Sequence, residues 1–501
     1  MKPAFSREKQ KEYLITKYEL SKTAAKFAEY YNSNFDKVEN GRKIYQYYHF
    51  LKDENIIKRI PEGQRILEIG CWTGDLLAKL KPSFGVGIDL CEKAISIAKQ
   101  KYKHENLQFI DGDFLNEKVR ELVNNEKFDY IVIINTIGQI HDLNSLFKIF
   151  HKYCHSRTRI FIYSYSRLWQ PIYSFAEFIG LKFKSPQESW LPPEELKQMF
   201  YLSNLQEVRW DLQILFPFKV PIFSKIINGF FAHLPFIENL CLIFGFVARP
   251  LLYEDNECKA DDSVSCSIII PCRNEEGHIK MLVERLPELG EKSEYVFVEG
   301  NSTDNTEEVI RKIISENPDR NFSFCKQLGK GKGDAVRLGF SKARYEILAI
   351  LDADISVAPE DLPSMLEILL NKKAEFVNGS RLVYPMEKKA MKYLNLIVNK
   401  SFALIFTYLL GQQVRDTLCG TKVLWKRDYE QIINNRTYFG DFDPFGDFDL
   451  LFGASKLNLK IIDFPVRYDE RTYGDTNISR FRDGWLLLKM VFFAFNKIKT
   501  I

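Results

Sequence analysis

The sequence predicts two α/β domains in tandem, each with a mostly parallel sheet. Each half of the 501-residue chain opens on a short apolar run followed by a helical pattern, and this alternation is typical of β-α units. A chain of this length exceeds what one hydrophobic core usually holds. Residues 251–264 are acidic and polar and lie between an apolar segment and a new strand, as a linker does. We therefore expect domains at 1–250 and 265–501, joined by the linker 251–264.

The composition excludes several classes of protein. Apolar residues at 46% and charged residues at 27% argue against a disordered or collagen-like chain. The 70 Lys and Arg against 66 Asp and Glu leave a net charge of +4, which is too balanced for a nucleic-acid-binding protein. The nine cysteines are scattered without a C-x-x-C pair, so we expect reduced thiols in a cytoplasmic enzyme rather than disulfides or a zinc site.

Two apolar stretches raise the question of a membrane. Residues 226–248 contain Asn, His, Pro and Glu, so we interpret them as a helix, a turn and a buried strand rather than a spanning helix. The tail at 485–495 is too short to span. Its aromatic and aliphatic residues, flanked by Arg and Lys, suit a terminal helix docked on its own domain or a helix at the inner face of the membrane.

The first half shows the spacing of a nucleotide-binding sheet. Residues 1–60 are expected to form a helical cover over the domain that follows. Strands are predicted at 65–70, 85–89, 107–114 and 128–135. Polar residues at the carboxyl ends of such strands meet at one edge of the sheet, where ligands bind.

A glycine-containing turn and two acids follow these strands. Gly70 and Gly74 allow the backbone to approach a ligand closely. Asp89 ends the second strand, where an acid can hydrogen-bond both hydroxyls of a ribose. Asp113 follows the third strand, where it can contact an adenine or cap a helix.

This ordered set resembles the class I S-adenosylmethionine-dependent methyltransferases over roughly residues 40–250. The resemblance implies a Rossmann-like sheet with S-adenosylmethionine as cofactor, Asp89 on the ribose and Asp113 near the adenine amino group. Cys71 and Thr73 stand near positions that relatives often fill with glycine, which narrows the pocket. The implied cofactor-binding residues are Glu68, Gly70, Gly74, Asp89 and Asp113.

A nicotinamide-binding domain is the alternative for this half. The loop lacks the middle glycine of G-x-G-x-x-G, and Glu68 suits the ammonium of a methionine better than a diphosphate. The methyltransferase interpretation is therefore favoured. A hydroxyl acceptor would benefit from a base, and His141, shortly after the fourth strand, is the candidate catalytic residue, with a surface or capping role as its alternative.

The second half places charged residues after successive strands. A strand at 266–270 runs into Pro271, Arg273 and Glu275, and the next strand ends at Glu299. Lys330 and Lys332 then lie in a glycine-rich turn that starts a helix, a suitable neighbour for a diphosphate. The turn lacks the ending of a P-loop, so ATP hydrolysis is not implied.

The strongest element is the pair Asp352 and Asp354 after the apolar strand 346–351. Two carboxylates at i and i+2, where a strand ends, can hold a hard divalent cation on the phosphates of a nucleotide. An exposed turn is the alternative, because this triplet also occurs by chance. Its place after the two preceding strand ends favours the metal.

The run from 265 to about 480 resembles family 2 inverting glycosyltransferases, with the GT-A type of nucleotide-diphospho-sugar fold, and most of all the polyprenyl- and dolichyl-phosphate sugar synthases. Glu299-Gly300 replaces a pair of Asp, and Asp447 and Asp449 stand where relatives carry Glu or Asp. The matching segments are 271–275, 298–304, 331–337, 352–354, 379–381, 415–420, 446–451 and 471–481.

The resemblance implies a role for each of these residues. Asp352 and Asp354 bind Mg²⁺ or Mn²⁺ on the diphosphate, and Asp416 or Asp449 lies beside the acceptor as a candidate catalytic residue. Either of the last two can instead be a helix cap or a solvated turn residue. The residues implied to line the donor are Pro271, Arg273, Glu275, Glu299, Lys330, Lys332, Asp352 and Arg471.

Together the halves indicate a bifunctional enzyme. One half would transfer a sugar from a nucleotide-diphospho-sugar donor to a lipid-phosphate or glycan acceptor, and the other would methylate a related molecule. One alternative keeps the sugar transfer and leaves the methyltransferase-like half as a binding or scaffold domain. The other makes the second half a nucleotidyltransferase.

Overall fold

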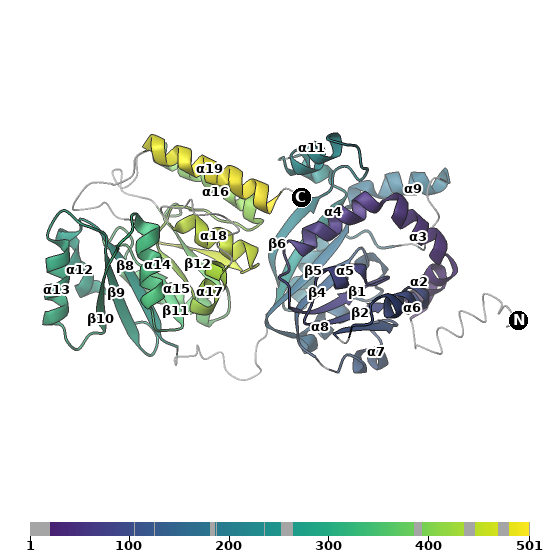
Figure 1. Cartoon of the computed structure of the whole chain (residues 1–501), viewed down its shortest axis with the longest axis horizontal. Helices are drawn as coiled ribbons and strands as arrows, with labels where there is room; N and C mark the ends of the chain where they lie inside the picture. The colour runs from purple at the N-terminus through teal and green to yellow at the C-terminus, as the bar shows by residue number, and fades with distance from the viewer. Residues whose placement is uncertain are drawn as a thin grey trace, which may run out of the picture. The chain divides into compact units, whose positions relative to one another are not determined.

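A computed structural model describes residues 21–104, 106–124, 126–180, 186, 188–234, 236–251, 264–384, 393–434, 446–468 and 480–499. The chain divides into two compact units, the first reaching Tyr253 and the second running from Glu254 to Lys499 (Figure 1). Each unit is built around a seven-stranded mixed sheet, so the prediction of two tandem α/β domains is confirmed.

The sheet of the first unit has the strand order β3-β2-β1-β4-β5-β7-β6. Strands β3, β2, β1, β4 and β5 run parallel to one another, and β7 runs antiparallel to its neighbours β5 and β6. The four strands predicted at the start of this half are present. The bounds are β1 (Arg65–Ile69), β2 (Phe84–Asp89), β3 (Leu107–Asp111), β4 (Phe128–Ile134), β5 (Cys154–Tyr165), β6 (Leu205–Gln213) and β7 (Ile243–Pro250).

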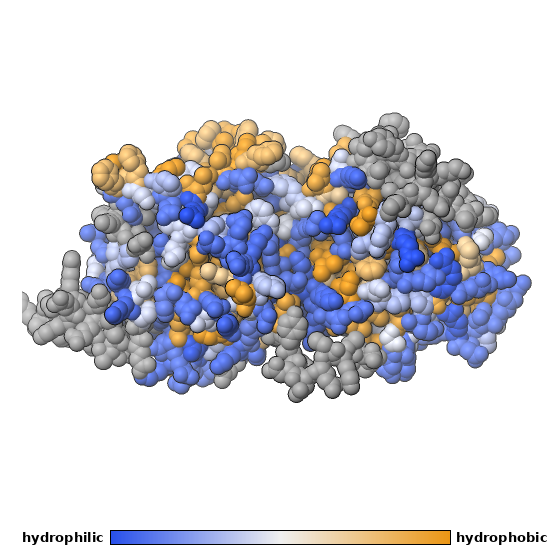
Figure 2. Space-filling model, turned by 180° about the vertical axis from the view of Figure 1, so that it is seen from behind, coloured by the Kyte–Doolittle hydropathy of each residue, from blue (hydrophilic) through white to orange (hydrophobic). Residues whose placement is uncertain are grey.

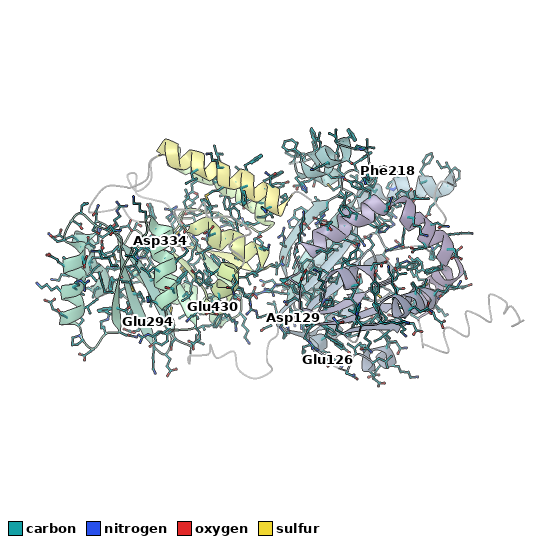
Figure 3. The ribbon with its side chains drawn as sticks, in the orientation of Figure 1. Glu126, Asp129, Phe218, Glu294, Asp334 and Glu430 are labelled. Carbon is teal, nitrogen blue, oxygen red and sulfur yellow. The ribbon has the colours of Figure 1, made fainter. Side chains whose placement is uncertain are left out.

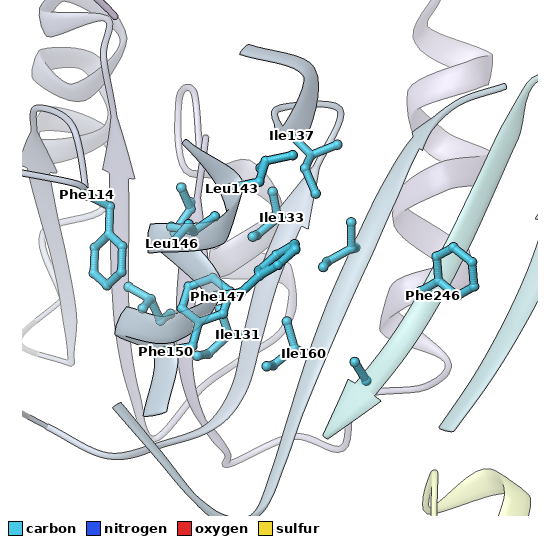
Figure 4. Close-up of a cluster of buried hydrophobic side chains, with 14 of the residues drawn as sticks. Phe114, Ile131, Ile133, Ile137, Leu143, Leu146, Phe147, Phe150, Ile160 and Phe246 are labelled. Atoms are coloured by element: carbon cyan, nitrogen blue, oxygen red, sulfur yellow. The ribbon is translucent and has the colours of Figure 1, made fainter. Parts of the chain in front are cut away.

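Helices bury both faces of this sheet. Because side chains alternate along a strand, β4 directs Ile131 and Ile133 into one core, shown in Figure 4, and Tyr130 and Val132 into the other. Helices α7, α8 and α10 contribute to the first core and α4, α5 and α6 to the second. The helices are α2 (Lys22–Ser33), α3 (Phe35–Ile44), α4 (Gln46–Ile57), α5 (Asp75–Lys79), α6 (Glu92–Lys101), α7 (Glu117–Glu121), α8 (Leu143–Phe150), α9 (Gln170–Phe178), α10 (Pro193–Leu202) and α11 (Phe223–Gly229).

Helices α2 to α4 form the expected N-terminal cover within the described residues. The Ser21 side chain accepts a hydrogen bond from the Ala24 N–H at 3.1 Å and so caps α2. Tyr31 on α2 and Phe35 on α3 pack against Trp72 in the loop after β1, and these ring contacts hold the cover on the sheet. The N-terminal helices thus close over the carboxyl edge of the sheet.

The sheet of the second unit has the strand order β10-β9-β8-β11-β13-β12-β14. Strands β10, β9, β8 and β11 are parallel, while β13 is antiparallel to β11 and β12. The parallel part therefore collects the carboxyl ends of β8, β9 and β11 at one edge. The bounds are β8 (Cys266–Cys272), β9 (Ser293–Glu299), β10 (Phe322–Lys326), β11 (Ile347–Ile350), β12 (Phe376–Ser380), β13 (Lys422–Trp425) and β14 (Ile461–Pro465).

Strand β11 explains the two cores of the second unit. Leu348 and Ile350 face one core, and Ile347 and Ala349 face the other. Both faces are covered by helices, as a parallel sheet requires. The helices are α12 (Glu276–Arg285), α13 (Thr306–Glu316), α14 (Lys332–Lys342), α15 (Leu362–Leu370), α16 (Tyr393–Leu410), α17 (Lys426–Asn434), α18 (Asp447–Lys456) and α19 (Arg480–Ile498).

The two apolar stretches are part of folded units. Residues 226–248 form the end of α11, turns and most of β7, as predicted. The tail is helix α19, which buries Met490 and Ala494 in a core of its own unit. Among the described residues, no helix combines the length and the apolar character needed to cross a membrane.

Candidate functional site

The first unit contains a cavity of about 370 Å³ at the carboxyl ends of β1, β2 and β4. Most of the residues predicted for this half meet in its wall, namely Glu68, Gly70, Asp89, Asp113 and His141. Gly74 caps α5 instead, with a φ of 75°. At Gly70, where φ is 83°, a Cβ would overlap the Thr136 side chain. Only glycine therefore fits this turn.

Asp89 is held by backbone donors at the end of β2. Its Oδ2 accepts the N–H of Trp72 and its Oδ1 accepts the N–H of Cys91, both at 2.8 Å. Burial raises the pKa of this carboxyl, and the two N–H donors act against that rise. Each carboxylate oxygen can accept a second hydrogen bond, so Asp89 is oriented and still able to bind a hydroxyl.

Glu68 is a buried acid beside the glycine turn. Burial raises its pKa to about 8, against the nearby positive charge of Lys52, which lowers it. Its Oε2 has no hydrogen-bond partner in the part of the chain that the structure describes. A buried carboxyl oxygen without a partner is costly, so the site suits a ligand that brings a donor or a positive charge to Glu68.

Asp113 and His141 lie at the outer part of the wall. The Asp113 Oδ1 accepts the N–H of Leu115 at 2.9 Å, so it holds a local turn, while α7 is capped by Asn116. Burial raises the pKa of Asp113. His141 is exposed, and its Nδ1 lies 3.1 Å from the Ser21 hydroxyl of the cover. Both remain candidates by position.

The cover adds residues that the sequence reasoning missed. His49 on α4 lines the cavity, and its Nδ1 has no partner among the described residues. Burial and the nearby Arg42 lower the pKa of His49 to about 3, so its imidazole is neutral. A lone His in a Tyr-rich helix gives no indication in the sequence that it lines a cavity, because only the tertiary packing of α4 places it there.

Three aromatic rings form another part of the wall. Tyr165, Tyr173 and Trp190 contact one another pairwise, with ring centroids 5.4 to 5.9 Å apart. All three line the cavity. They come from β5, α9 and the segment before α10, and no motif in the sequence links them. Such a wall gives a second substrate a surface to stack on.

The second unit gathers acids at the ends of β8 and β9. Glu275 follows β8 and lies 2.8 Å from the His278 Nδ1, and Glu299 ends β9 and accepts the N–H of Ser302 at 2.5 Å. The Glu299 Oε2 has no partner among the described residues. Burial raises the pKa of Cys272, and the charges of Glu275, Glu299 and Asp352 add to the rise, so all three acids surround the end of β8.

Asp352 follows β11 and forms an ion pair with Lys332 at the start of α14. Burial alone would lower the pKa of Lys332, but Asp352, Asp447 and Asp354 raise it well above its ordinary value. At Gly420, a Cβ would overlap both the Lys332 ammonium and the Asp352 carboxylate. The backbone of the 415–420 segment therefore lies against this ion pair and leaves no room for a side chain.

Asp354 and the glycine-rich turn complete this edge. The Asp354 Oδ1 accepts the N–H and the hydroxyl of Ser356, at 3.0 and 2.7 Å. The turn before α14 is held by Gln327, whose amide donates to Gly331 and to Asp334 (Figure 3). Lys330 is exposed at the tip of this turn, whereas Lys332 points inward to Asp352. The two lysines therefore have different surroundings.

The described residues fit a divalent cation in part. Asp352 and Asp354 supply hard carboxylate oxygens two residues apart, and Gly420 adds no side chain of its own beside the Asp352–Lys332 ion pair. No group of three or more His, Cys, Asp or Glu side chains placed to hold a metal occurs within the residues described. The remaining ligands would then be phosphate oxygens and water, as is common for Mg²⁺ on a nucleotide.

Asp416, predicted to lie beside the acceptor, is held in a buried ion pair. It is fully buried and makes a two-pronged ion pair with Arg381, at 2.7 and 2.9 Å, and it accepts the Asn399 amide at 3.0 Å. Burial would raise its pKa, but Arg381 outweighs burial and lowers the pKa to about 2. Such a carboxylate is a weak base, and it orients Arg381, which stacks on Tyr468.

Asp449 and Arg471 complete the predicted set. Asp449 lies on α18, 3.9 Å from the Arg337 guanidinium, in the wall of a small cavity with Gly333 and Gly446. Asp447, two residues earlier, is one of the acids whose charge raises the pKa of Lys332. It also forms an ion pair at 3.0 Å with Lys422, a lysine that is fully buried. Arg471 lies outside the described residues.

Pro271 and Arg273 end β8 beside these acids. The following backbone is tied to the loop after β9, because the N–H groups of Asn274 and Glu275 donate to Ser302 and Thr306 at 3.0 and 2.9 Å. Arg273 is exposed. The two predicted donor-binding loops are thus one hydrogen-bonded structure.

Comparison with known proteins supports both halves. Residues 60–207 match the family model of the methyltransferase domain, and residues 267–439 match that of glycosyl transferase family 2. The two resemblances predicted from the sequence are thereby confirmed.

Relatives with curated descriptions align with less than half of this chain. The chain is 28% identical to a low-salt glycan biosynthesis hexosyltransferase of Haloferax volcanii, over 45% of this chain and 52% of that protein. It is 28% identical to a dolichyl-phosphate beta-glucosyltransferase of Trichomonas vaginalis, over 42% and 67%. It is 24% identical to the polyprenol monophosphomannose synthase of Mycolicibacterium smegmatis, over 42% and 80%. The chain thus spans about half the length of the first of these relatives.

Solved structures resemble each unit. Glucosyl-3-phosphoglycerate synthase from Mycobacterium tuberculosis, in complex with Mn²⁺, UDP and glucosyl-3-phosphoglycerate, covers 49% of this chain and 86% of its own, at 17% identity and a TM-score of 0.35. Magnesium protoporphyrin IX methyltransferase from Synechocystis, with bound SAH, covers 46% and 99%, at 11% identity and a TM-score of 0.33.

The placement of Asp416 yields a test. The Asp416→Ala variant leaves Arg381 buried without its partner, so the free energy of unfolding of the second unit should fall by about 3–5 kcal/mol in urea denaturation. Glu360→Ala is the matched control, because it breaks the partly exposed Arg285–Glu360 pair and should cost about 1 kcal/mol or less. Equal and small losses in both variants would show that Asp416 does not anchor the fold.

Proposed function

For a chain with a methyltransferase domain and a family 2 glycosyltransferase domain, we propose a bifunctional enzyme of glycolipid or glycan synthesis. The glycosyltransferase domain, at 265–501, transfers a sugar from a nucleotide-diphospho-sugar to a lipid phosphate or a glycan. The domain at 1–250 methylates a related molecule with S-adenosylmethionine. The observation that carries the proposal is the gathering of Glu275, Glu299 and Asp352 around the ends of three parallel strands, with Lys332 among them.

Different residues at this edge would contact different parts of the nucleotide-sugar donor. Glu299, with an unpartnered buried oxygen, suits the hydroxyls of the nucleoside, and Glu275 with Pro271 and Arg273 forms the neighbouring wall. Asp352 and Asp354 would hold Mg²⁺ or Mn²⁺, which supplies positive charge to the diphosphate as it leaves. Lys332 balances the charge of Asp352 when no cation is bound.

The transfer is a single displacement at the anomeric carbon. A bond forms from an acceptor oxygen to this carbon, and the bond to the diphosphate breaks with its electron pair on the diphosphate. A lipid phosphate is already anionic and needs no base, which agrees with the placement of Asp416 in a buried ion pair. The relatives named for dolichyl phosphate and polyprenol support this acceptor class. A hydroxyl acceptor would need Asp449, Asp447 or another base.

The cavity of the first unit supports methyl transfer rather than a scaffold role. Glu68 keeps an unpartnered oxygen where the ammonium of a methionine would lie, and Asp89 is oriented for a ribose. Burying these acids lowers the stability of the fold, so their presence favours a ligand-binding role over a purely structural one. In the transfer, the methyl carbon leaves the sulfonium with the electron pair staying on sulfur, and an acceptor oxygen that attacks must lose its proton. His141 lines the cavity and is the candidate to take it, whereas the low pKa of His49 makes that imidazole a poor base.

The enzyme is proposed to work on the cytoplasmic side of a membrane. The cysteines that the structure describes are all free, which suits a reducing compartment. A lipid-phosphate acceptor would bring the chain to the membrane surface, and helix α19 exposes Leu488 and Phe492.

Sugar transfer tests the metal site. In a screen of nucleotide-sugars with Mg²⁺ or Mn²⁺, the Asp354→Ala variant should lose transfer by about a hundredfold or more, because the leaving diphosphate loses its counter-charge. Glu360→Ala, an exposed loop acid of the same unit, is the control and should keep full activity. Transfer that survives both the substitution and chelation would remove the metal from the mechanism. Consumption of the nucleotide-sugar with release of a free nucleoside diphosphate would exclude a nucleotidyltransferase, whereas consumption that requires added pyrophosphate and yields a nucleoside triphosphate would indicate one.

Calorimetry tests the role of Glu68. With a pKa of about 8, Glu68 is mostly protonated at pH 7 in the free chain, and the ammonium of S-adenosylmethionine would favour its ionised form. Binding should therefore release protons at pH 7, seen as a dependence of the binding heat on the ionisation enthalpy of the buffer, and the release should fade above pH 9.

The Glu68→Gln variant should bind more weakly and release no protons. Glu62→Gln, an exposed acid paired with Lys81, is the matched control and should behave as the wild type. An unchanged proton release in Glu68→Gln would assign it to another group. No binding heat at all in the wild type would favour the scaffold alternative.

A further inference from the structure

Helix α9 packs on its own unit through Tyr173, and yet none of its residues is fully buried. It exposes Ile172, Phe175 and Phe178, with Phe178 86% accessible. An apolar helix in a water-soluble unit normally buries one side against a core. The outer side of α9 is therefore unpartnered within the described residues.

A second segment, residues 218–240, exposes apolar side chains in the same way. Phe218, Ile222 and Phe223 are each at least half accessible, and so are Phe230 and Phe236. The Trp169 Nε1 donates to the Leu240 carbonyl at 2.9 Å, which ties this segment to the start of α9. We call the exposed apolar side chains of residues 168–179 and 218–240 the apolar face.

The two parts of the apolar face lie on the same side of the first unit. Helices α9 and α11 lie at the same end of the first unit in Figure 1, and Figure 2 shows hydrophobic side chains gathered over both of them. Isolated exposed apolar residues need no explanation, but a large contiguous patch marks an interaction surface.

The backbone holds two of these side chains outward at a cost. Ile222 has a φ of 65° and Phe236 a φ of 70°, and both are more than three-quarters accessible. Bulky residues rarely adopt this left-handed conformation, which costs on the order of 1–2 kcal/mol. Strain of this kind persists where it serves a function, and here it presents an Ile and a Phe to the surroundings.

The charge pattern of residues 214–237 favours an anionic partner. This stretch contains no Asp or Glu, and Lys219 and Lys225 are exposed among its apolar side chains; the two acids in the segments of the apolar face, Glu177 and Glu238, lie outside it. Long lysine side chains at the edge of an apolar surface reach toward anionic headgroups while the apolar residues enter the acyl region. A protein interface, by contrast, is depleted of lysine.

The apolar face also borders the cavity of the first unit. Tyr45 lines the cavity and contacts Phe218 of the apolar face, with ring centroids 6.0 Å apart (Figure 3). Tyr173, on α9, lines the cavity from another side. A molecule held in a bilayer at the apolar face would lie beside the cavity.

We propose that the apolar face of the first unit docks on a bilayer that contains anionic lipids. The methyl acceptor then reaches the cavity from the membrane. This contact lies on a different unit from helix α19. The docking itself needs neither the sugar transfer nor the methyl transfer to be correct, and only the delivery of the methyl acceptor rests on the proposed function.

Vesicle flotation of the full chain, without substrates, tests the proposal. Wild type should float with vesicles of phosphatidylcholine and phosphatidylglycerol, and less with phosphatidylcholine alone. In the double variant Phe178→Glu with Ile222→Glu, binding to the mixed vesicles should fall by about tenfold or more, because two side chains that insert into the bilayer become charged. Lys219→Gln with Lys225→Gln should lose the preference for phosphatidylglycerol.

The matched control is Tyr201→Glu with Leu202→Glu, two accessible apolar residues at the end of α10 outside the apolar face, which should bind as the wild type does. All exchanged positions are exposed, so the thermal midpoints should match. Wild type that fails to float, or a Phe178/Ile222 double variant that floats equally, would overturn the proposal. So would a wild-type dimer that this double variant converts to a monomer, because the apolar face would then bind a second copy.

Discussion

The second unit depends on one constraint, which is that several carboxylates share the carboxyl edge of a parallel sheet. Glu275, Glu299 and Asp352 surround Cys272, and Asp447 acts on the same lysine as Asp352. These like charges repel one another at short range, and the positive charges of Lys332 and Lys422 reduce that repulsion by pairing with Asp352 and Asp447. Gly420 is part of the same solution, because a Cβ there would displace the ion pair.

The first unit also places acids at the carboxyl edge of its sheet. Glu68 and Asp89 lie at the carboxyl ends of β1 and β2, the helical cover closes over them, and burial raises their pKa values. Asp89 is stabilised by two backbone N–H groups, whereas Glu68 retains an oxygen without a partner. The two edges therefore differ in what they demand. In the proposed function, one would hold a cation beside anionic phosphates, and the other a positively charged ligand beside a buried acid.

The sequence predicted the sheets and the residues that end their strands, because both follow from local patterns. Asp89 and Asp352 were found in this way. Contacts between distant segments were not predictable. Nothing near Asp416 in the chain reveals that Arg381 and Asn399 would enclose it, and the His49 helix gives no sign that it faces Glu68. The exposed face of α9 was missed for a further reason. An apolar helix pattern predicts burial, and only the fold shows that none of the described residues covers this face.

Direct binding of Mn²⁺ tests the central claim, that Asp352 and Asp354 hold a cation against a nucleoside diphosphate. The measurement is the loss of the free Mn²⁺ signal in electron paramagnetic resonance as the full chain is added, with UDP and with GDP in parallel. The account predicts weak uptake without nucleotide, strong uptake with the matching one, and neither in Asp352→Asn. Uptake that needs no nucleotide and persists in that variant would contradict it.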